Sequence, residues 1–355
     1  MAVIRTATGL RIEVATRLDA LGPEWTPLFA AGPGLNARRD WFAVSAEAAV
    51  AAPATPRYVL MDDADGPAAV VPMLAGPGRH WRSLTTPYTC LFQPLIRPGA
   101  SPELLRQIGR GFGRLCRNWP VTVLEALALD WPGMDPFLAG LRDAGLAARQ
   151  FAHFGNWFLE VPGWSWPQYL QTRPGPLRET IRRKTKLVGR EPGLRLEIAQ
   201  TPAALGPALA AYEAVYARSW KQPEPFPDFN QALVERFASS GVLRMGLMWA
   251  GEQPIAAQYW AVLDGSATVL KLAHDDRFKA ISPGTVLTAH MVRSLLEQDT
   301  VRELDFGRGD DPYKRGWAEH RRSRIGLLLA SPWSVAGLAS LLRHDAGVAL
   351  RRLKR

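Results

Sequence analysis

The chain has 355 residues, a net charge of +10 and an apolar content of 47%, which suits two soluble globular domains better than one. No stretch approaches the ~20 charge-free apolar residues of a membrane-spanning helix, and the first residues mix Arg, Glu and Asp into their apolar run, unlike a signal peptide. Two cysteines, Cys90 and Cys116, exclude a disulfide framework and a four-cysteine zinc site. Without a membrane span or a signal peptide, we expect a cytoplasmic protein. The histidines have no metal-ligand spacing, so we also expect no metal.

The positive charge is unevenly distributed. Residues 1–150 carry 15 arginines, no lysine and 13 acids, whereas the rest of the chain carries 28 basic and 20 acidic residues. Two segments are especially basic, residues 173–190 and the last 35 residues. Such segments favour an anionic partner such as phosphate, a membrane surface or nucleic acid, although a merely solvated surface explains either one alone.

The first half alternates strands and helices. Hydrophobic periodicity predicts, in order, a strand (10–16), two helices (17–32 and 37–52), a hairpin (56–63 and 66–76), a helix (101–118), a strand (121–129), a helix (131–150) and a strand (155–161). Ser101-Pro102-Glu103 is a helix-start signal. The pattern predicts mixed α/β structure.

The second half repeats this order of elements. It predicts a basic helix (167–191) interrupted at Pro174-Gly175, a strand (194–200), two helices (201–220 and 228–241), a three-strand meander (242–276), a helix from Ser282 and strands at 301–309 and 324–330. We find no strict sequence repeat. The fold class predicted is α/β (α+β), with two related domains, each a mixed, mostly antiparallel sheet flanked by helices. The expected boundaries are 1–163 and 164–330, followed by a basic amphipathic tail, 331–355.

The turn Ser282-Pro283-Gly284-Thr285 joins a strand to a helix. A helix N-terminus offers free N–H groups and a positive dipole end, and glycine allows phosphate to approach the backbone closely. Ser282 could cap this helix, and Lys279 lies just upstream. The turn therefore suits a pyrophosphate, and the alternative is an ordinary helix cap.

A charged string, "ELDFGRGDDPYKRGW", follows the next strand. Ligands of open α/β sheets bind where strands end. Asp305 or Asp310 could hold an ammonium group or accept its proton, and Tyr313 could protonate a leaving thiolate. Arg308 and Lys314 could bind phosphate or carboxylate, and Trp317 completes the substrate-binding candidates. The alternative is a salt-bridged loop that satisfies itself. His274, at the end of the meander, is the other candidate general base.

These two strings carry a family resemblance. "KAISPG" loosely fits the pyrophosphate loop Q/R-x-x-G-x-G/A of the GNAT acyltransferase superfamily, with Lys279, Ser282 and Gly284 at the patterned positions. "KLAHDDRFKAISPGTVL" and "ELDFGRGDDPYKRGW" resemble the BioF2-like or CelD-like branch, which is similar to the FemAB peptidoglycan aminoacyl transferases. The resemblance covers roughly residues 165–330. Residues before it are similar only as a divergent second GNAT-like domain.

The resemblance implies an N-acyltransferase that holds an acyl-CoA for direct attack by an amine. Lys279, Ser282, Pro283, Gly284 and Thr285 would then bind the CoA donor. Some bacterial ceramide synthases look like members of this branch, so a sphingoid lipid amine is one expected acceptor and an envelope or polysaccharide precursor another. The basic tail, with Trp and Leu, suggests peripheral contact with an anionic inner membrane face, against a helix that only packs on its domain. Two alternative hypotheses for the function are a Fem-type aminoacyl-tRNA transferase and a non-catalytic accessory protein of envelope polysaccharide or lipid biosynthesis.

Overall fold

The structure is a computed structural model that describes residues 3–5 and 9–353. The chain forms two compact units. The first contains Met1–Phe154 and Ser323–Arg355, and the second contains Gly155–Arg322. The first unit therefore takes up residues 323–330, which the sequence places with the second domain. The division at residues 163 and 330 stays a prediction about domains.

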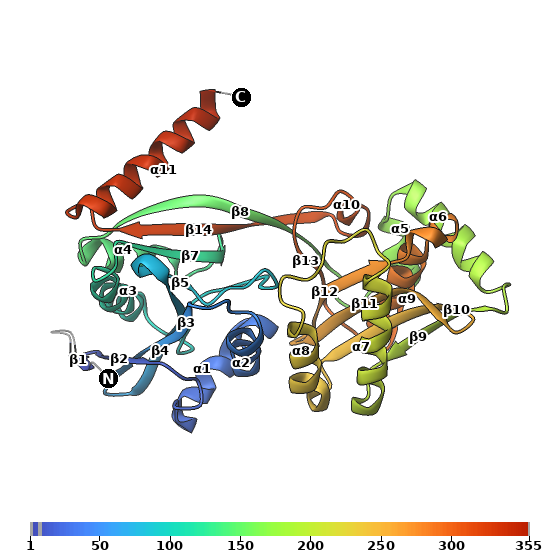
Figure 1. The fold of residues 1–355 in the computed structure, drawn as a ribbon, viewed down its shortest axis with the longest axis horizontal. Helices are drawn as coiled ribbons and strands as arrows, with labels where there is room; N and C mark the ends of the chain where they lie inside the picture. Colours follow the sequence, from blue (N-terminus) through green and yellow to red (C-terminus); the bar gives the residue numbers. More distant parts are fainter. Residues whose placement is uncertain (1–2, 6–8, 354–355) are drawn as a thin grey trace. The chain divides into compact units, whose positions relative to one another are not determined.

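The first unit is built on a mostly antiparallel sheet with the strand order β1-β2-β3-β4-β5-β7-β14 (Figure 1). Among its described strands only the pair β5–β7 is parallel, and β6 adds to β4. The strands are β1 (Val3–Arg5), β2 (Arg11–Ala15), β3 (Thr55–Asp63), β4 (Gly66–Gly76), β5 (His80–Ser83), β6 (Leu95–Ile96), β7 (Val121–Ala128) and β14 (His320–Ala330). The helices are α1 (Thr26–Ala31), α2 (Arg39–Ala48), α3 (Pro102–Cys116), α4 (Met134–Asp143) and α11 (Val335–Leu353). At the start of α3, Ser101 accepts a hydrogen bond from the Leu104 N–H, as its sequence predicts.

The second unit has the strand order β8-β13-β12-β11-β10-β9, and only β12–β13 is parallel. The strands are β8 (Ala147–Glu160), β9 (Leu194–Ala199), β10 (Leu243–Ala250), β11 (Gln253–Leu263), β12 (Ser266–His274) and β13 (Glu303–Arg308). The helices are α5 (Trp166–Thr172), α6 (Gly175–Val188), α7 (Pro202–Tyr216), α8 (Phe229–Phe237), α9 (Pro283–Glu297) and the short α10 (Lys314–Trp317). β8 and β14 each cross the boundary between the units along the chain.

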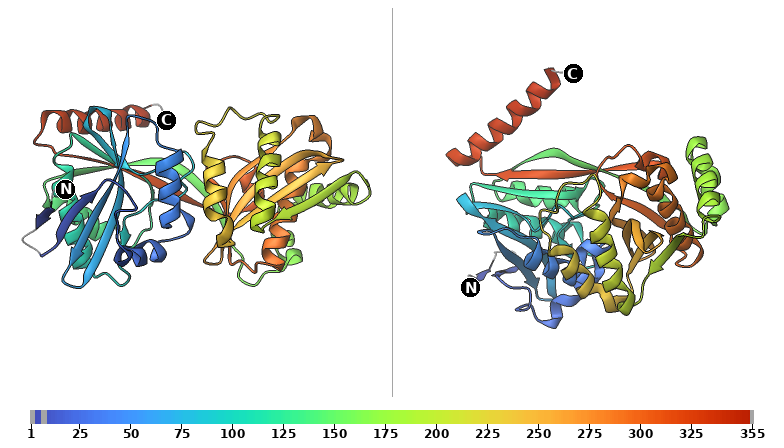
Figure 2. Two further views of the ribbon diagram at one scale, coloured as in Figure 1. Left: turned by 60° about the horizontal axis from the view of Figure 1, so that its bottom comes forward. Right: turned by 45° about the vertical axis from the view of Figure 1, so that its right-hand side comes forward.

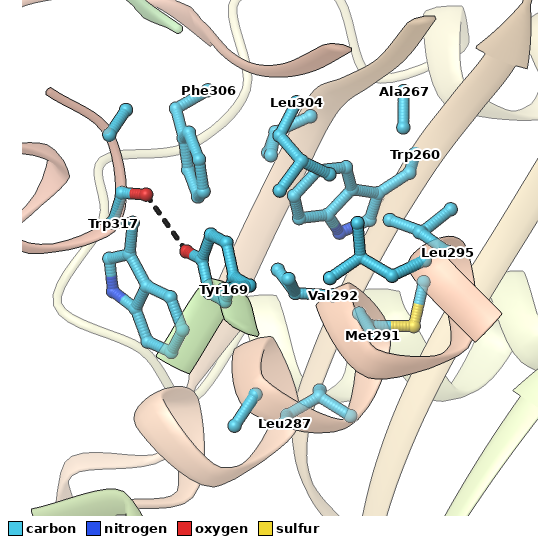
Figure 3. Close-up of a cluster of buried hydrophobic side chains, with 14 of the residues drawn as sticks. Tyr169, Trp260, Ala267, Leu287, Met291, Val292, Leu295, Leu304, Phe306 and Trp317 are labelled. Atoms are coloured by element: carbon cyan, nitrogen blue, oxygen red, sulfur yellow. Dashed lines mark hydrogen bonds between the residues drawn. The ribbon is translucent and has the colours of Figure 1, made fainter. Parts of the chain in front are cut away.

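Helices α7 and α9 cover opposite faces of the second sheet. Tyr259 on β11 packs against Tyr212 of α7, with ring centroids 5.2 Å apart. Its neighbour Trp260 points the other way, into a buried cluster with Leu287, Met291 and other α9 side chains (Figure 3). Alternate strand residues face opposite sides, so this sheet has a hydrophobic layer on each face.

The cluster on the α9 side also fixes the short helix α10. Trp260 meets Phe306 of β13 edge to face at 5.6 Å, and Phe306 stacks on Trp317 at 6.4 Å. The Tyr169 hydroxyl on α5 donates to the Trp317 carbonyl at 2.8 Å (Figure 3). Because Tyr169 is fully buried, this bond holds α10 against the core and places the charged string after β13.

The predicted fold class is confirmed: each unit is a mostly antiparallel mixed sheet with helices around it. Two predicted helices are shorter than expected. Residues 147–150 belong to strand β8, because α4 ends before Gly145, whose φ of +78° belongs to the left-handed region. In the segment 17–32, only residues from Pro23 onward are helical, first as a 3₁₀ turn and then as α1. No helix among the described residues has both the length and the apolarity to span a membrane.

Candidate active site

A cavity of about 490 Å³ lies in the second unit. Its walls come from β11, the end of β12, the first turns of α9, the loop and helix after β13, one residue of α6 and one of the α7–α8 loop. The lining residues are Leu177, Trp220, Ala257, Gln258, Leu272, Ala273, His274, Gly284, Thr285, Leu287, Thr288, Pro312, Tyr313, Gly316 and Trp317. Both strings that the sequence singled out thus contribute to one mostly apolar chamber.

The chamber opens where two parallel strands part. β12 and β13 pair only from Ser266–Glu303 to Thr268–Asp305. Beyond this register β12 continues to His274, and the stretch that lines the cavity, Leu272 to His274, is paired with β11 but no longer with β13. The edge that has parted from β13 presents backbone groups as well as side chains to a ligand, so an extended molecule could lie along this part of β12.

The turn before α9 has an unusual backbone. Ser282 adopts φ 52° and ψ 55°, the left-handed region that few residues other than glycine occupy. Ser282 does stand at the N-cap, but its side chain makes no capping bond, so the expectation that its hydroxyl caps the helix is wrong. Pro283 is buried at the first helical position, and Gly284 and Thr285 line the cavity. The first turn of α9 therefore meets the chamber without a side-chain cap.

Gly284 lies directly against His274. A Cβ built on Gly284 would stand 3.1 Å from His274 Nδ1, closer than ordinary contacts. The Thr288 hydroxyl donates to the Gly284 carbonyl at 2.8 Å, within the first turns of α9. Glycine at this position keeps the end of β12 and the start of α9 in close approach.

His274 is a half-buried imidazole with two acidic neighbours, Asp276 and Asp275. Its ring lies 4.4 Å from the Trp220 ring, and its Nε2 is 3.4 Å from an Asp276 carboxylate oxygen. Burial lowers the pKa of His274 below its ordinary value, and the charge of Lys221 lowers it further against the opposite pull of Asp276. The imidazole is therefore neutral at neutral pH and able to accept a proton.

Tyr313 and Trp317 bring the second string to the cavity. Trp317 is buried, whereas Tyr313 keeps 43% of its surface because it borders the open side. Protein atoms packed around the ring, and the nearby Asp311 carboxylate, raise the pKa of the Tyr313 phenol. Its hydroxyl stays protonated at neutral pH and can donate a proton or a hydrogen bond.

Asp305 does not line the cavity. Its carboxylate accepts hydrogen bonds from Asn156 Nδ2 at 2.6 Å, from the Gly307 N–H at 2.7 Å and from Arg322 Nη2 at 2.6 Å. Arg322 also bonds Glu303 at 3.1 Å, so residues 303 and 305 share a face, as strand alternation predicts. This network joins β13, β8 and β14 within the second unit.

Asp310 and Lys314 also lie outside the cavity wall. Asp310 accepts bonds from Arg321 and, at 2.6 Å, from Trp157 Nε1; these bonds lower its pKa to about 2. The buried Lys314 donates to the Arg308 carbonyl at 2.7 Å and lies 3.0 Å from an Asp311 oxygen. Arg308 ends β13 and is not a lining residue. The structure thus brings His274, Gly284, Thr285, Tyr313 and Trp317 together, apart from Asp305, Asp310, Arg308 and Lys314.

The remaining predicted donor residue, Lys279, is exposed in the 3₁₀ segment Asp276–Ile281 and does not line the cavity. The neighbouring basic helix α6 packs beside this segment, and Lys184 Nζ donates to the Ala280 carbonyl at 2.5 Å. In the sequence, the basic charge of α6 indicated an anionic partner. It did not indicate which other element this helix would lie beside. The structure places this charge beside the turn that precedes α9.

Sequence reasoning missed two polar lining residues, Gln258 of β11 and Thr288 of α9. Gln258 is 2% exposed; its amide oxygen accepts from Trp260 Nε1 at 2.9 Å, and its amide nitrogen donates to the Thr288 hydroxyl at 3.3 Å. A buried amide with both ends engaged gives the apolar chamber one ordered polar wall. Strand and helix periodicity assigns these residues to faces, but no local signal brings them to one cavity.

Within the described ranges, no three His, Cys, Asp or Glu side chains are grouped in a way that could hold a metal ion. The expectation of no metal stays a prediction. Both cysteines are buried, and neither is in a disulfide.

Comparison with known proteins agrees with this arrangement. Residues 176–315 match the model of an acetyltransferase (GNAT) domain. Among solved structures, FemX has a TM-score of 0.60 at 9% identity, covering 90% of this chain and 97% of FemX. A conserved protein of unknown function from Bacteroides thetaiotaomicron has a TM-score of 0.54 at 8% identity, covering 82% of this chain and 89% of that one. A tandem GNAT protein from the clavulanic acid biosynthesis pathway has a TM-score of 0.50 at 13% identity, covering 91% and 100%.

No curated protein matches the sequence. At these low identities the solved structures show a shared fold, which extends over both units. The matched range includes 13 of the 15 lining residues, all except Gly316 and Trp317, and it contains β12, the turn at Ser282 and α9. The comparisons therefore support an acyltransferase that has a match to a GNAT acetyltransferase domain at residues 176–315 and shares its fold with FemX.

Proposed function

We propose that the protein transfers an acyl group from a CoA thioester to an amine by direct attack. The observation that carries this proposal is the single chamber in which His274, the uncapped first turn of α9 and Tyr313 meet. The pyrophosphate of CoA would lie on the N–H groups at Gly284 and Thr285, with Lys279 at the exposed edge. The apolar walls would hold the pantetheine arm and the acyl chain.

His274 would accept the proton that the attacking amine must lose. The amine nitrogen forms a bond to the thioester carbonyl carbon, and the carbon–sulfur bond breaks to release the CoA thiolate. Tyr313 would donate its phenolic proton to that thiolate. His274 and Tyr313 then exchange protons with solvent, and most of the rate enhancement comes from holding the two reactants in line.

The charged string would act mainly by positioning. Asp305 and Asp310 are engaged by arginines and by Asn156 or Trp157, and Lys314 is held by carbonyls of its own loop. These bonds hold the segment that carries Tyr313 and Trp317. A direct catalytic role of Asp305 or Asp310, and ligand binding by Arg308 or Lys314, stay predictions from the sequence.

The acceptor we favour is a lipid amine such as a sphingoid base, with an envelope or polysaccharide precursor as the alternative. The apolar lining of the chamber supports a long acyl chain or an apolar acceptor. A cytoplasmic protein that acts at the inner face of the membrane would meet such lipid molecules there. A second candidate is an aminoacyl-tRNA donor, which is favoured by the basic helix α6 beside the chamber. The exposed basic residues of α6 include Arg178, Arg182, Arg183 and Lys186.

Calorimetric titration with CoA, acetyl-CoA, palmitoyl-CoA and an aminoacyl-tRNA tests the proposal. We expect palmitoyl-CoA to bind most tightly, and Gly284→Asp to weaken CoA binding about tenfold or more, because it adds bulk and negative charge at the phosphate seat. Gly206→Asp is the matched control, since a side chain there meets open space on α7 of the same unit. Binding of tRNA with no CoA binding would reject the CoA donor and favour the second candidate.

A further inference from the structure

Helix α11 carries a solvent-facing apolar stripe. Five of the large apolar side chains in the described part of the chain that remain mostly exposed lie in and just before this helix: Trp333 (86%), Val335 (90%), Leu338 (45%), Leu342 (59%) and Leu350 (59%). Exposed residues at 335, 338, 342, 346 and 349 are all apolar and follow the spacing of one helix face. The stripe is therefore continuous along the helix.

The opposite side of α11 already serves the fold of the first unit. Leu341 is 3% exposed, and Asp345 pairs with Arg149 of β8 at 2.8 Å. His344 and Val348, which follow Leu341 at helical spacing, border a cavity of about 600 Å³ between α11 and the sheet strands. The outer stripe is thus additional to the face that packs, and the helix extends beyond the strands of its unit (Figures 1 and 2).

Charge identifies what such a stripe fits. Residues 331–355 contain five basic residues and one acid, Asp345, whose carboxylate is engaged by Arg149. Arg343 is exposed beside the stripe, whereas Arg351 borders the inner cavity with His344 and Val348. Tryptophan prefers the boundary between lipid and water, and Trp333 stands at the start of the helix. An apolar face flanked by Arg343, in a segment with an excess of basic residues, matches the surface of an anionic bilayer.

We propose that α11 and Trp333 form a docking surface for anionic phospholipid membranes. The helix lies in the plane of the interface, with Trp333, Leu338 and Leu342 among the acyl chains and Arg343 at the headgroups. The surface belongs to the first unit and does not depend on the acyl transfer proposed above.

Vesicle co-sedimentation of the full chain tests this surface. We expect binding to vesicles of equal phosphatidylglycerol and phosphatidylcholine, little binding to pure phosphatidylcholine, and weakening with salt. The triple variant Trp333→Ser, Leu338→Ser, Leu342→Ser should bind at least about tenfold more weakly. Because all three side chains are exposed, the variant should fold normally, which circular dichroism verifies.

Two matched controls distinguish binding through this surface from non-specific binding of the protein to vesicles. Leu129→Ser removes another large side chain of the first unit, 51% exposed, and should leave binding unchanged. Arg343→Gln should weaken binding about fivefold, whereas Arg114→Gln, at an exposed arginine of α3, should not. Equal sedimentation of the triple variant and the parent would overturn the proposal. A lipid-free dimer that the triple variant abolishes, without vesicle binding by the parent, would also overturn it and make the stripe an interface between two copies.

Discussion

At the scale of single residues, the pKa of His274 makes a direct prediction. Burial lowers that pKa below its ordinary value, so the ring loses its proton at lower pH than a free histidine. If neutral His274 is the base, the kcat/KM of acyl transfer rises with pH through this lowered pKa and then levels off. His274→Gln should reduce kcat about 100-fold and remove the acid limb from the pH profile.

His290 supplies the control for this measurement. It is a second half-buried histidine of the same unit with a pKa also lowered by burial, but it does not line the cavity. His290→Gln should leave both the rate and the acid limb in place. An acid limb that survives in His274→Gln at a near-normal rate would remove His274 from the chemistry.

Lys271 gives a second prediction, on stability. Burial lowers the pKa of this lysine to about 8, although the Glu224 carboxylate beside its ammonium opposes the shift. Between pH 8 and the ordinary value of 10.5, the unfolded chain holds this proton while the folded protein has released it. The contribution of Lys271 to the free energy of unfolding therefore rises with pH across this window, by on the order of 1 kcal/mol per pH unit.

Urea unfolding of the parent and of Lys271→Met, measured at about six pH values from roughly pH 7.5 to 10.5, isolates this contribution, because methionine does not titrate. The difference in the free energy of unfolding between the two proteins should change steadily over the window in favour of the parent. A constant difference would show that the lysine keeps its proton in the folded state.

Residue types were readable from the sequence, but their environments were not. Strand alternation places Glu303 and Asp305 on one face, which Arg322 confirms by bonding both. It cannot say that Arg322 and Asn156, far away in sequence, saturate the Asp305 carboxylate. His274 and Gly284 lie ten positions apart, with a 3₁₀ segment between them, and their contact depends on how that segment turns. Long-range packing decides which candidates reach a cavity, and a local pattern carries no information about it.

At the scale of elements, the network between β13, β8 and β14 should stabilise the second unit. Asp305→Asn keeps the shape of the side chain but leaves the half-buried Arg322 without its 2.6 Å carboxylate partner. Because Arg322 keeps Glu303 as a second carboxylate partner, the loss of this charged hydrogen bond costs roughly 1.5–3 kcal/mol. We expect the free energy of unfolding to fall by that order, with a fall in turnover that follows the loss of folded structure.

Asp143→Asn is the comparison for this change. Asp143 pairs with Arg106 and Arg110 on the surface of the first unit, where solvent weakens such pairs, so its loss should cost much less. A stable Asp305→Asn protein with greatly reduced turnover would instead support the direct catalytic role that the sequence suggested for Asp305.

Element order was more readable than element ends. The meander β10–β12 and the helix α9 follow the predicted pattern because turn residues bound each run of apolar residues. β8 and β14 are longer than predicted, since both continue past the segments whose alternation is visible in the sequence. Pairing with distant strands extends them, and that pairing is a property of the sheet and not of the local sequence.

At the scale of the whole molecule, the two units are not consecutive along the chain, because the first unit contains both the N-terminal and the C-terminal segments. This arrangement leads to a prediction. The first unit is closed by residues from the end of the chain, whereas every residue that lines the candidate active site lies between residues 155 and 322. Deleting Ser331–Arg355 removes Leu341 from the core of the first unit and Asp345 from its pair with Arg149. The loss of one buried leucine alone costs roughly 1.5–3 kcal/mol.

The truncated protein should therefore unfold at lower urea concentration through its first unit, while its affinity for palmitoyl-CoA stays that of the full chain. Leu341→Ala in the full chain should move unfolding in the same direction and also leave the affinity unchanged, which separates packing from the loss of the exposed stripe. The two readouts test one property of the architecture, because only a cavity built entirely from the second unit can keep its ligand when the first unit is weakened. A truncated protein that remains folded but binds palmitoyl-CoA less tightly would show that the C-terminal helix contributes to the donor site.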